Sequence, residues 1–186
     1  MARLLRVGLV VAFGMAWAIR SAIGLQDPDY WSPVTELDYA AVWWYSIALS
    51  LSAGVIWLIG WLARTDRWSI WIAGAVGAGL LLAAVANVFE DGLGMKWVGT
   101  IYVVGAMVGG YGLFVLAARL ALVGAPGLAG VALGTVVGMM LHGSIGGFIV
   151  LGLSLWLAER LIRRPETLAP RPRPKSTLVD EATLEA

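Results

Sequence analysis

Long apolar runs separated by short charged gaps recur along most of this chain, from Leu4 to Leu161. A helix rises about 1.5 Å per residue, so about 20 apolar residues are needed to cross a hydrocarbon core about 30 Å thick. Only 13% of the 186 residues are charged, which is about half of the share in soluble domains. The pattern predicts an all-α fold, a polytopic bundle of transmembrane helices joined by short loops.

Four spans are clear, and a fifth long stretch gives one or two more. The clear spans cover residues 4–24, 39–63, 68–89 and 97–118. As a single helix, residues 120–161 would be about 60 Å long, twice the bilayer core, so the chain must break there. The segment His142–Gly147 holds three glycines and is the favoured break, which gives six spans, the last two over residues 120–141 and 145–161. The alternative is five spans, with one tilted helix starting at Gly127.

The charge distribution favours six spans and predicts the orientation. With six spans, one side receives the arginines at positions 3, 6, 64, 67, 119, 160, 163 and 164, and the other receives nearly all of the carboxylates of the loops. Lys and Arg collect on the cytoplasmic side of membrane proteins. We therefore predict a protein of the cell membrane, with a bundle over residues 1–164 and both termini in the cytoplasm.

Two segments near the ends of the chain allow more than one interpretation. Residues 165–186 alternate Pro with Arg and Lys and then turn acidic, which predicts a disordered cytoplasmic tail. Its basic part either serves as a stop-transfer signal or binds anionic lipid. At the other end, Ala16-Trp17-Ala18 after an Arg-rich start is compatible with a cleaved signal peptide, whereas the apolar residues that follow favour a retained helix.

Composition excludes several kinds of site. The chain has no Cys, which excludes disulfides and thiolate metal sites, and its single His cannot supply a two-histidine haem site. No basic stripe with interleaved aromatic residues indicates nucleic-acid binding. We expect no metal or cofactor, and we expect the lipid bilayer as the main partner. Glycines such as Gly105, Gly109 and Gly134 predict close helix packing within the chain or, alternatively, a face for homo-oligomers or other membrane subunits.

The six-span topology places several polar residues at the outer rim as a candidate binding site. They are Arg20, Asp38, Asn87, Glu90, Asp91 and His142. Arg20 is expected to snorkel to water, pair with a rim carboxylate such as Glu90 or Asp91, or contact a ligand. The spacing of Asn87, Glu90 and Asp91 (i, i+3, i+4) predicts one shared helix face. His142 is expected in a turn, as a hydrogen-bonded residue, a proton relay or a metal ligand.

Other polar residues in the spans have a structural interpretation. Trp43-Trp44-Tyr45 is typical of an aromatic belt at the membrane interface. Ser46, Ser50, Ser52 and Ser154 lie inside spans, where hydroxyls usually bond to the backbone of their own helix.

These features leave three function classes open. The first is a non-enzymatic membrane protein that binds or passes a small molecule, or that serves as a subunit of a membrane complex. The second is an intramembrane lipid- or terpenoid-modifying enzyme of the isomerase or cyclase type. In it, Glu90 or Asp91 would be the general acid, because adjacent carboxylates raise the pKa of one of them. The third is the membrane anchor of a redox complex that uses His142. No sequence motif selects a reaction, and the first class is the preferred interpretation.

Overall fold

The computed structural model describes residues 1–26, 36–141 and 144–168, with the backbone only for residues 36–39. In these ranges the chain forms six α-helices and no strand. They are α1 (Ala2–Gln26), α2 (Glu36–Leu62), α3 (Arg67–Asn87), α4 (Gly99–Leu122), α5 (Pro126–Met140) and α6 (Gly146–Arg163). Three short turns accompany them, the π-helix η1 (Val88–Gly92) and the 3-10 helices η2 (Lys96–Val98) and η3 (Pro165–Leu168). The predicted all-α bundle is confirmed.

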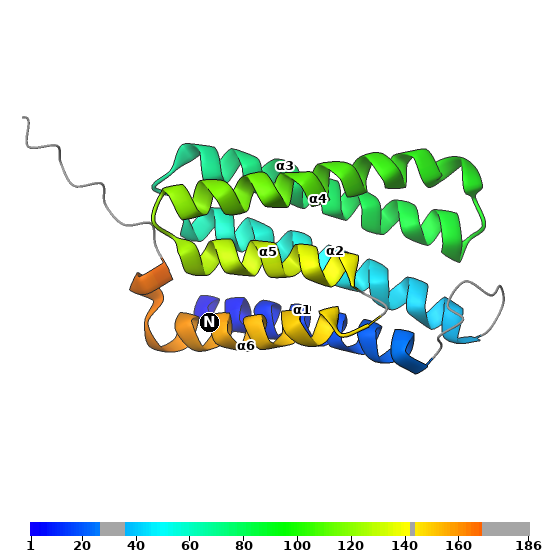
Figure 1. Cartoon of the computed structure of the whole chain (residues 1–186), viewed down its shortest axis with the longest axis horizontal. Coiled ribbons are helices and arrows are strands. Elements are labelled where there is room, and N and C mark those ends of the chain that lie inside the picture. Colours follow the sequence, from blue (N-terminus) through cyan, green and yellow to red (C-terminus); the bar gives the residue numbers. More distant parts are fainter. Residues whose placement is uncertain (27–35, 142–143, 169–186) are drawn as a thin grey trace, which may run out of the picture.

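Four of the helical segments are long and apolar enough to cross a membrane. These are Ala2–Gln26, Ala40–Leu62, Arg67–Gly92 and Lys96–Leu122. Helix α5 has only 15 residues, about 22 Å, which is shorter than the bilayer core. In Figure 1 the α5–α6 hairpin stops well short of the end that α1 to α4 reach. Six helices are therefore present, and complete crossing by α5 and α6 stays a prediction.

The connection between α4 and α5 lies later in the chain than predicted. Gly124 adopts a φ of 80°, in the left-handed region that favours glycine. Its N–H donates to the carbonyl of Ala121, and the N–H of Ala125 donates to the carbonyl of Leu120, the bonding pattern of a Schellman helix end. Pro126 then occupies the first turn of α5, where its missing N–H costs nothing. The prediction that the fifth span begins at residue 120 was wrong, because this turn keeps residues 120–122 in α4.

Consecutive helices pack as antiparallel neighbours, and α6 returns to pack along α1 (Figure 1). Helices α3 and α4 approach closely through glycines. A Cβ at Gly105 would lie 2.7 Å from the backbone N of Ala83, and one at Gly109 would lie 2.7 Å from Cδ2 of Leu80. The predicted packing role within the chain is confirmed for these two glycines. The position of Gly130, by contrast, is open, with nothing within 4 Å of a Cβ.

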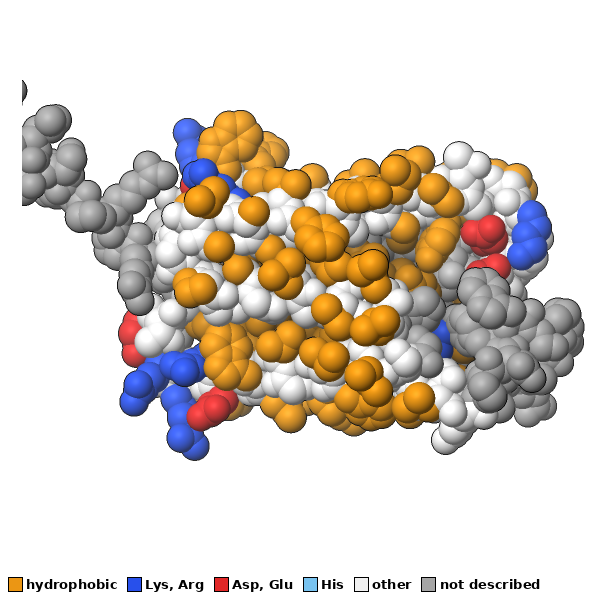
Figure 2. Space-filling model, viewed as in Figure 1, with side chains coloured by type: hydrophobic (Ala, Val, Ile, Leu, Met, Phe, Trp, Pro, Cys, Tyr) orange, Lys and Arg blue, Asp and Glu red, His pale blue; other side chains and the backbone are white. Residues whose placement is uncertain are grey.

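Charged side chains gather at the two ends of the bundle, and apolar side chains cover its middle (Figure 2). One end, termed the basic end, carries the start of α1, the end of α6 and the eight arginines that were predicted to share one side. The opposite end carries Glu90, Asp91 and Lys96. The first residues of the predicted disordered tail instead form η3, in which Leu168 is buried. The rest of that tail lies outside the described residues.

Candidate functional site

Arg20 lies inside the bundle. Its side chain has 0% exposure, although it belongs to a helix long and apolar enough to span a membrane. Helix α1 continues from Arg20 to Gln26, about 9 Å further, so the guanidinium lies below the end of the helix. The prediction that Arg20 snorkels to water at the rim was therefore wrong. Its burial makes it the first candidate for a functional side chain.

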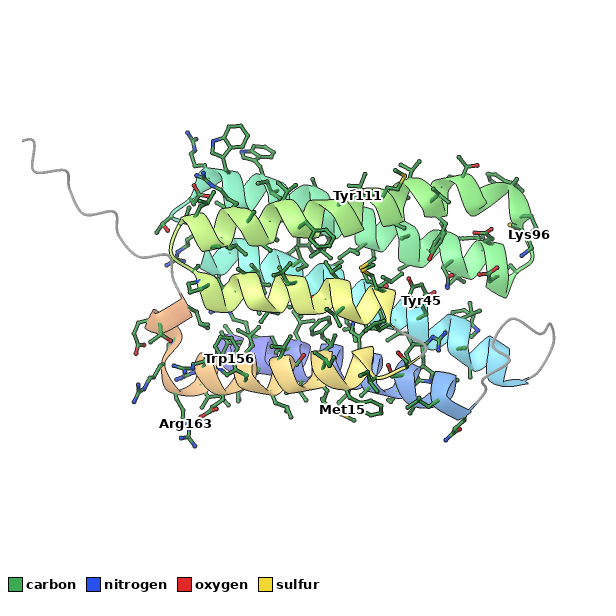
Figure 3. The ribbon with its side chains drawn as sticks, viewed as in Figure 1. Met15, Tyr45, Lys96, Tyr111, Trp156 and Arg163 are labelled. Atoms are coloured by element: carbon green, nitrogen blue, oxygen red, sulfur yellow. The ribbon has the colours of Figure 1, made fainter. Side chains whose placement is uncertain are left out.

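Polar side chains of α2, α3 and α4 meet in the half of the bundle away from the basic end. The Nδ2 of Asn87 donates to the Oγ of Ser46 at 2.9 Å and to the carbonyl of Val42 at 3.3 Å. The hydroxyls of Tyr45 and Tyr102 lie 3.4 Å apart. Figure 3 places Tyr45 between the middle of the molecule and the end that carries Lys96. Asn87 was a predicted site residue, and the structure buries it at this interhelical contact.

Side chains of helix α1 lie at the same height along the bundle. The rings of Trp17 and Tyr45 meet edge to face with centroids 5.9 Å apart, and Nε1 of Trp17 donates to the Oγ of Ser52 at 3.0 Å. Next to Arg20, the Oγ of Ser21 accepts a 2.8 Å hydrogen bond from the N–H of Gly147, at the start of α6. We term this set of side chains the polar layer; it consists of Arg20, Ser21, Tyr45, Ser46, Asn87 and Tyr102.

The polar layer coincides with the level at which the α5–α6 hairpin ends. Helix α6 begins at Gly146, beside Ser21, whereas α2 extends from Tyr45 back to Glu36, about 14 Å further. Among the described helices, α1 to α4 extend beyond the layer and α5 and α6 do not (Figure 1).

Glu90 and Asp91 have surroundings that differ from those of the polar layer. Asp91 is exposed, and its Oδ1 accepts from Nζ of the exposed Lys96 at 3.3 Å. Glu90 is half-buried, with its carboxylate packed over Gly99 at the start of α4. Asn87 is buried, Asp91 is exposed, and the π-helical turn η1 begins directly after Asn87. The common face expected for Asn87, Glu90 and Asp91 stays a prediction. The expected coupling of Arg20 to these two carboxylates stays a prediction.

Two predicted site residues lack a described side chain. Asp38 belongs to the first turns of α2, and its side chain lies outside the described residues, as does all of His142. Sequence reasoning missed other residues of the layer. Tyr45, expected in an interfacial belt, is 8% exposed, and Ser46 accepts from Asn87 on another helix. Ser50, Ser52 and Ser154 do bond to carbonyls of their own helices, as predicted.

A second polar contact, at the basic end, was not predicted. Asp66 begins α3 as its N-cap and accepts from the N–H and the Oγ of Ser69 at 3.0 and 2.8 Å. Its two oxygens also accept from Nε and Nη2 of Arg119, on α4, at 2.8 and 2.6 Å. The hydrogen bond from Arg119 holds the pKa of Asp66 far below its usual range. This ion pair ties the α2–α3 turn to the last turn of α4, which is a structural role.

The polar layer combines the buried guanidinium of Arg20 with the amide of Asn87 and the hydroxyls of Ser21, Tyr45, Ser46 and Tyr102. Within the described ranges, no group of three or more His, Asp or Glu could hold a metal ion. No protein-family model matches the chain, and neither a curated protein nor a solved structure matches it. The function therefore has to be inferred from the residues themselves.

Proposed function

We propose that this chain is a multi-pass protein of the cell membrane that binds a small anionic molecule at its polar layer without transforming it. The four membrane-length helices support insertion in a bilayer. The eight arginines at one end support a cytoplasmic position for that end and for both termini, since Lys and Arg collect on that side. The polar layer then lies in the outer half of the membrane.

The burial of Arg20 carries the proposal. A cation inside a membrane-spanning helix costs about 3 kcal/mol or more, and such cations mark substrate or ion pathways in membrane proteins. A guanidinium presents a planar set of donors that matches a carboxylate or a phosphate. The hydroxyls of Tyr45 and Tyr102, on two other helices, add donors and acceptors close together. The ligand class that fits is a small molecule with one anionic group and further hydrogen-bonding groups.

The general-acid alternative has less support from the contacts. A carboxylic acid that is to stay protonated near neutral pH needs burial or a neighbouring negative charge. Asp91 has an exposed side chain that pairs with Lys96, which leaves the half-buried Glu90 as the one remaining candidate of this alternative. This arrangement favours a solvated turn at residues 88–96.

The test compares binding of small carboxylates and organic phosphates by the intact protein and by Arg20→Gln. We expect at least one anion of the panel to raise the thermal unfolding temperature of the wild type. At a concentration of one hundred times its Kd, the anion should add about 2.7 kcal/mol to the free energy of unfolding. Arg20→Gln should abolish the shift. Arg67→Gln, a change of an exposed arginine at the basic end, should keep it.

A second variant covers the case in which Arg20→Gln fails to fold. Tyr102→Phe removes one hydroxyl of a half-buried ring and should weaken binding of the same anion while leaving the fold intact. The proposal is wrong if no anion of the panel stabilises the wild type. It is also wrong if the shift persists unchanged in Arg20→Gln.

A further inference from the structure

Two arginines from different segments converge on one tryptophan at the basic end. The Cζ of Arg6, in α1, lies 3.8 Å from the ring centroid of Trp61, in the last turn of α2. The Cζ of Arg64, just after α2, lies 4.9 Å from the same centroid. Trp61 is 41% exposed, so the cluster opens to the surroundings of the bundle. Two cations from different segments thus contact the same indole.

The carboxylate nearest in sequence does not neutralise this pair. Asp66, two residues after Arg64, is bound by Arg119 and Ser69 through both of its oxygens. The ion pairs found in the described part of the chain involve Lys96, Arg119 and Arg163, and none includes Arg6 or Arg64. An anion that contacts either guanidinium group would compensate its positive charge. The geometry therefore suits a bound anion.

The surroundings of the cluster favour a lipid as the source of that anion. Tryptophan side chains prefer the headgroup level of a bilayer, and Trp68 and Trp71 are 67% and 75% exposed near the start of α3. Towards the middle of the bundle, α1 and α2 meet through Leu9 and Gly54, an apolar contact. A phosphate would lie at the arginines while its acyl chains follow the apolar flank. Guanidinium groups bind phosphate oxygens through paired, charge-assisted hydrogen bonds.

We propose that Arg6, Trp61 and Arg64 form a specific binding site for the phosphate of an anionic phospholipid, in the leaflet at the basic end. The site goes beyond general attraction of a basic surface to anionic lipid, because it depends on two particular arginines and on the indole that both of them contact. It requires insertion of the bundle in a bilayer. It is independent of the ligand proposed for the polar layer.

The test counts lipids retained by the full-length protein after extraction from vesicles of mixed phosphatidylcholine and phosphatidylglycerol, by native mass spectrometry. The wild type should retain phosphatidylglycerol in preference to phosphatidylcholine. Arg6→Gln and Arg64→Gln should each lower that retention about tenfold, the effect of removing one charge-assisted hydrogen-bonding partner of the phosphate. Arg67→Gln and Arg163→Gln remove exposed arginines of the same end that do not contact Trp61, and they should leave retention unchanged.

Several results would overturn this site. If Arg67→Gln lowers the retention of phosphatidylglycerol as much as Arg6→Gln does, the lipid is attracted diffusely to the whole basic end. Equal retention of phosphatidylcholine would mean anchoring by tryptophans alone, and displacement by equimolar inorganic phosphate would mean a phosphate site rather than a lipid site. If a glutamine variant does not fold, Arg6→Lys and Arg64→Lys replace it in the test, because they keep the charge and lose the paired donors. Both should lower the retention of phosphatidylglycerol, and unchanged retention in both contradicts the proposal. Arg20→Gln should still retain the lipid, so failure of the lipid site can be distinguished from failure of the anion site at the polar layer.

Discussion

Asp66 is the residue whose charge has the clearest structural consequence. Its carboxylate caps α3 and pairs with Arg119, and this hydrogen bond lowers its pKa in the folded protein. A depressed folded pKa means that the ionised carboxylate stabilises the fold at any pH above the unfolded value, about 3.9. The contribution is lost progressively as the pH falls below about 4, towards the lower folded pKa.

We therefore predict that Asp66→Asn lowers the thermal unfolding temperature at pH 7 and has a smaller effect at pH 3. Asn is also a good N-cap residue, so the change removes the charge pair and spares most of the cap. Unfolding of the detergent-solubilised protein, followed by circular dichroism between pH 3 and 7, measures the difference. Asp91→Asn is the matched control, since that carboxylate pairs with an exposed lysine and should matter little at either pH. An equal loss of stability by Asp66→Asn at both pH values would contradict the argument.

At the scale of the elements, helices α1 and α6 approach each other closely at Gly147. A Cβ at Gly147 would collide with the carbonyl oxygen of Trp17 and would lie 2.6 Å from the Oγ of Ser21. The N–H of Gly147 also donates to that Oγ, so the backbones of the two helices must stay this close. A Cβ at Gly146 would likewise lie 2.7 Å from the carbonyl oxygen of Leu141.

We predict that Gly147→Ala destabilises the bundle by about 1–3 kcal/mol, the usual cost of overpacking. Gly152→Ala, one and a half turns further along α6, is the matched control, because nothing lies within 4 Å of its Cβ position. That change should be neutral or stabilising by up to about 1 kcal/mol, since Ala favours a helix over Gly. Thermal unfolding of both variants in the same detergent gives the comparison. Similar effects of the two changes would mean that α1 and α6 do not pack this closely.

At the scale of the whole molecule, the two ends of the bundle differ in charge, and this difference predicts its orientation. We expect a cysteine in place of Leu93, between η1 and η2, to react with a membrane-impermeant maleimide added outside intact cells. A cysteine in place of Thr65, at the basic end, should react only after the membrane is permeabilised. Both positions are exposed in the bundle, so the membrane alone should decide the outcome. The reverse labelling would place the basic end outside and contradict the orientation.

The sequence by itself determined where the helices begin and end, because those limits depend on local properties. Apolar length and the glycines around residue 145 each act on their own stretch of backbone, and the predicted spans agree with α1 to α4 within a few residues. The gathering of arginines at one end follows equally from the order of spans and loops. Only the turn between α4 and α5 was placed too early, since its Schellman bonds, rather than the charge of Arg119, end the helix.

Only the tertiary structure decided which polar side chains are buried together. Arg20 and Tyr45 were expected at the rim and are buried, because α1 and α2 continue past them and neighbouring helices cover them. Asn87 donates to Ser46 inside the bundle, whereas Asp91, four residues later, is exposed and pairs with Lys96. The hairpin of α5 and α6 ends at the level of Ser21. Such relations depend on the length and rotation of helices that are far apart in sequence, and the spacing of residues within one helix does not contain them.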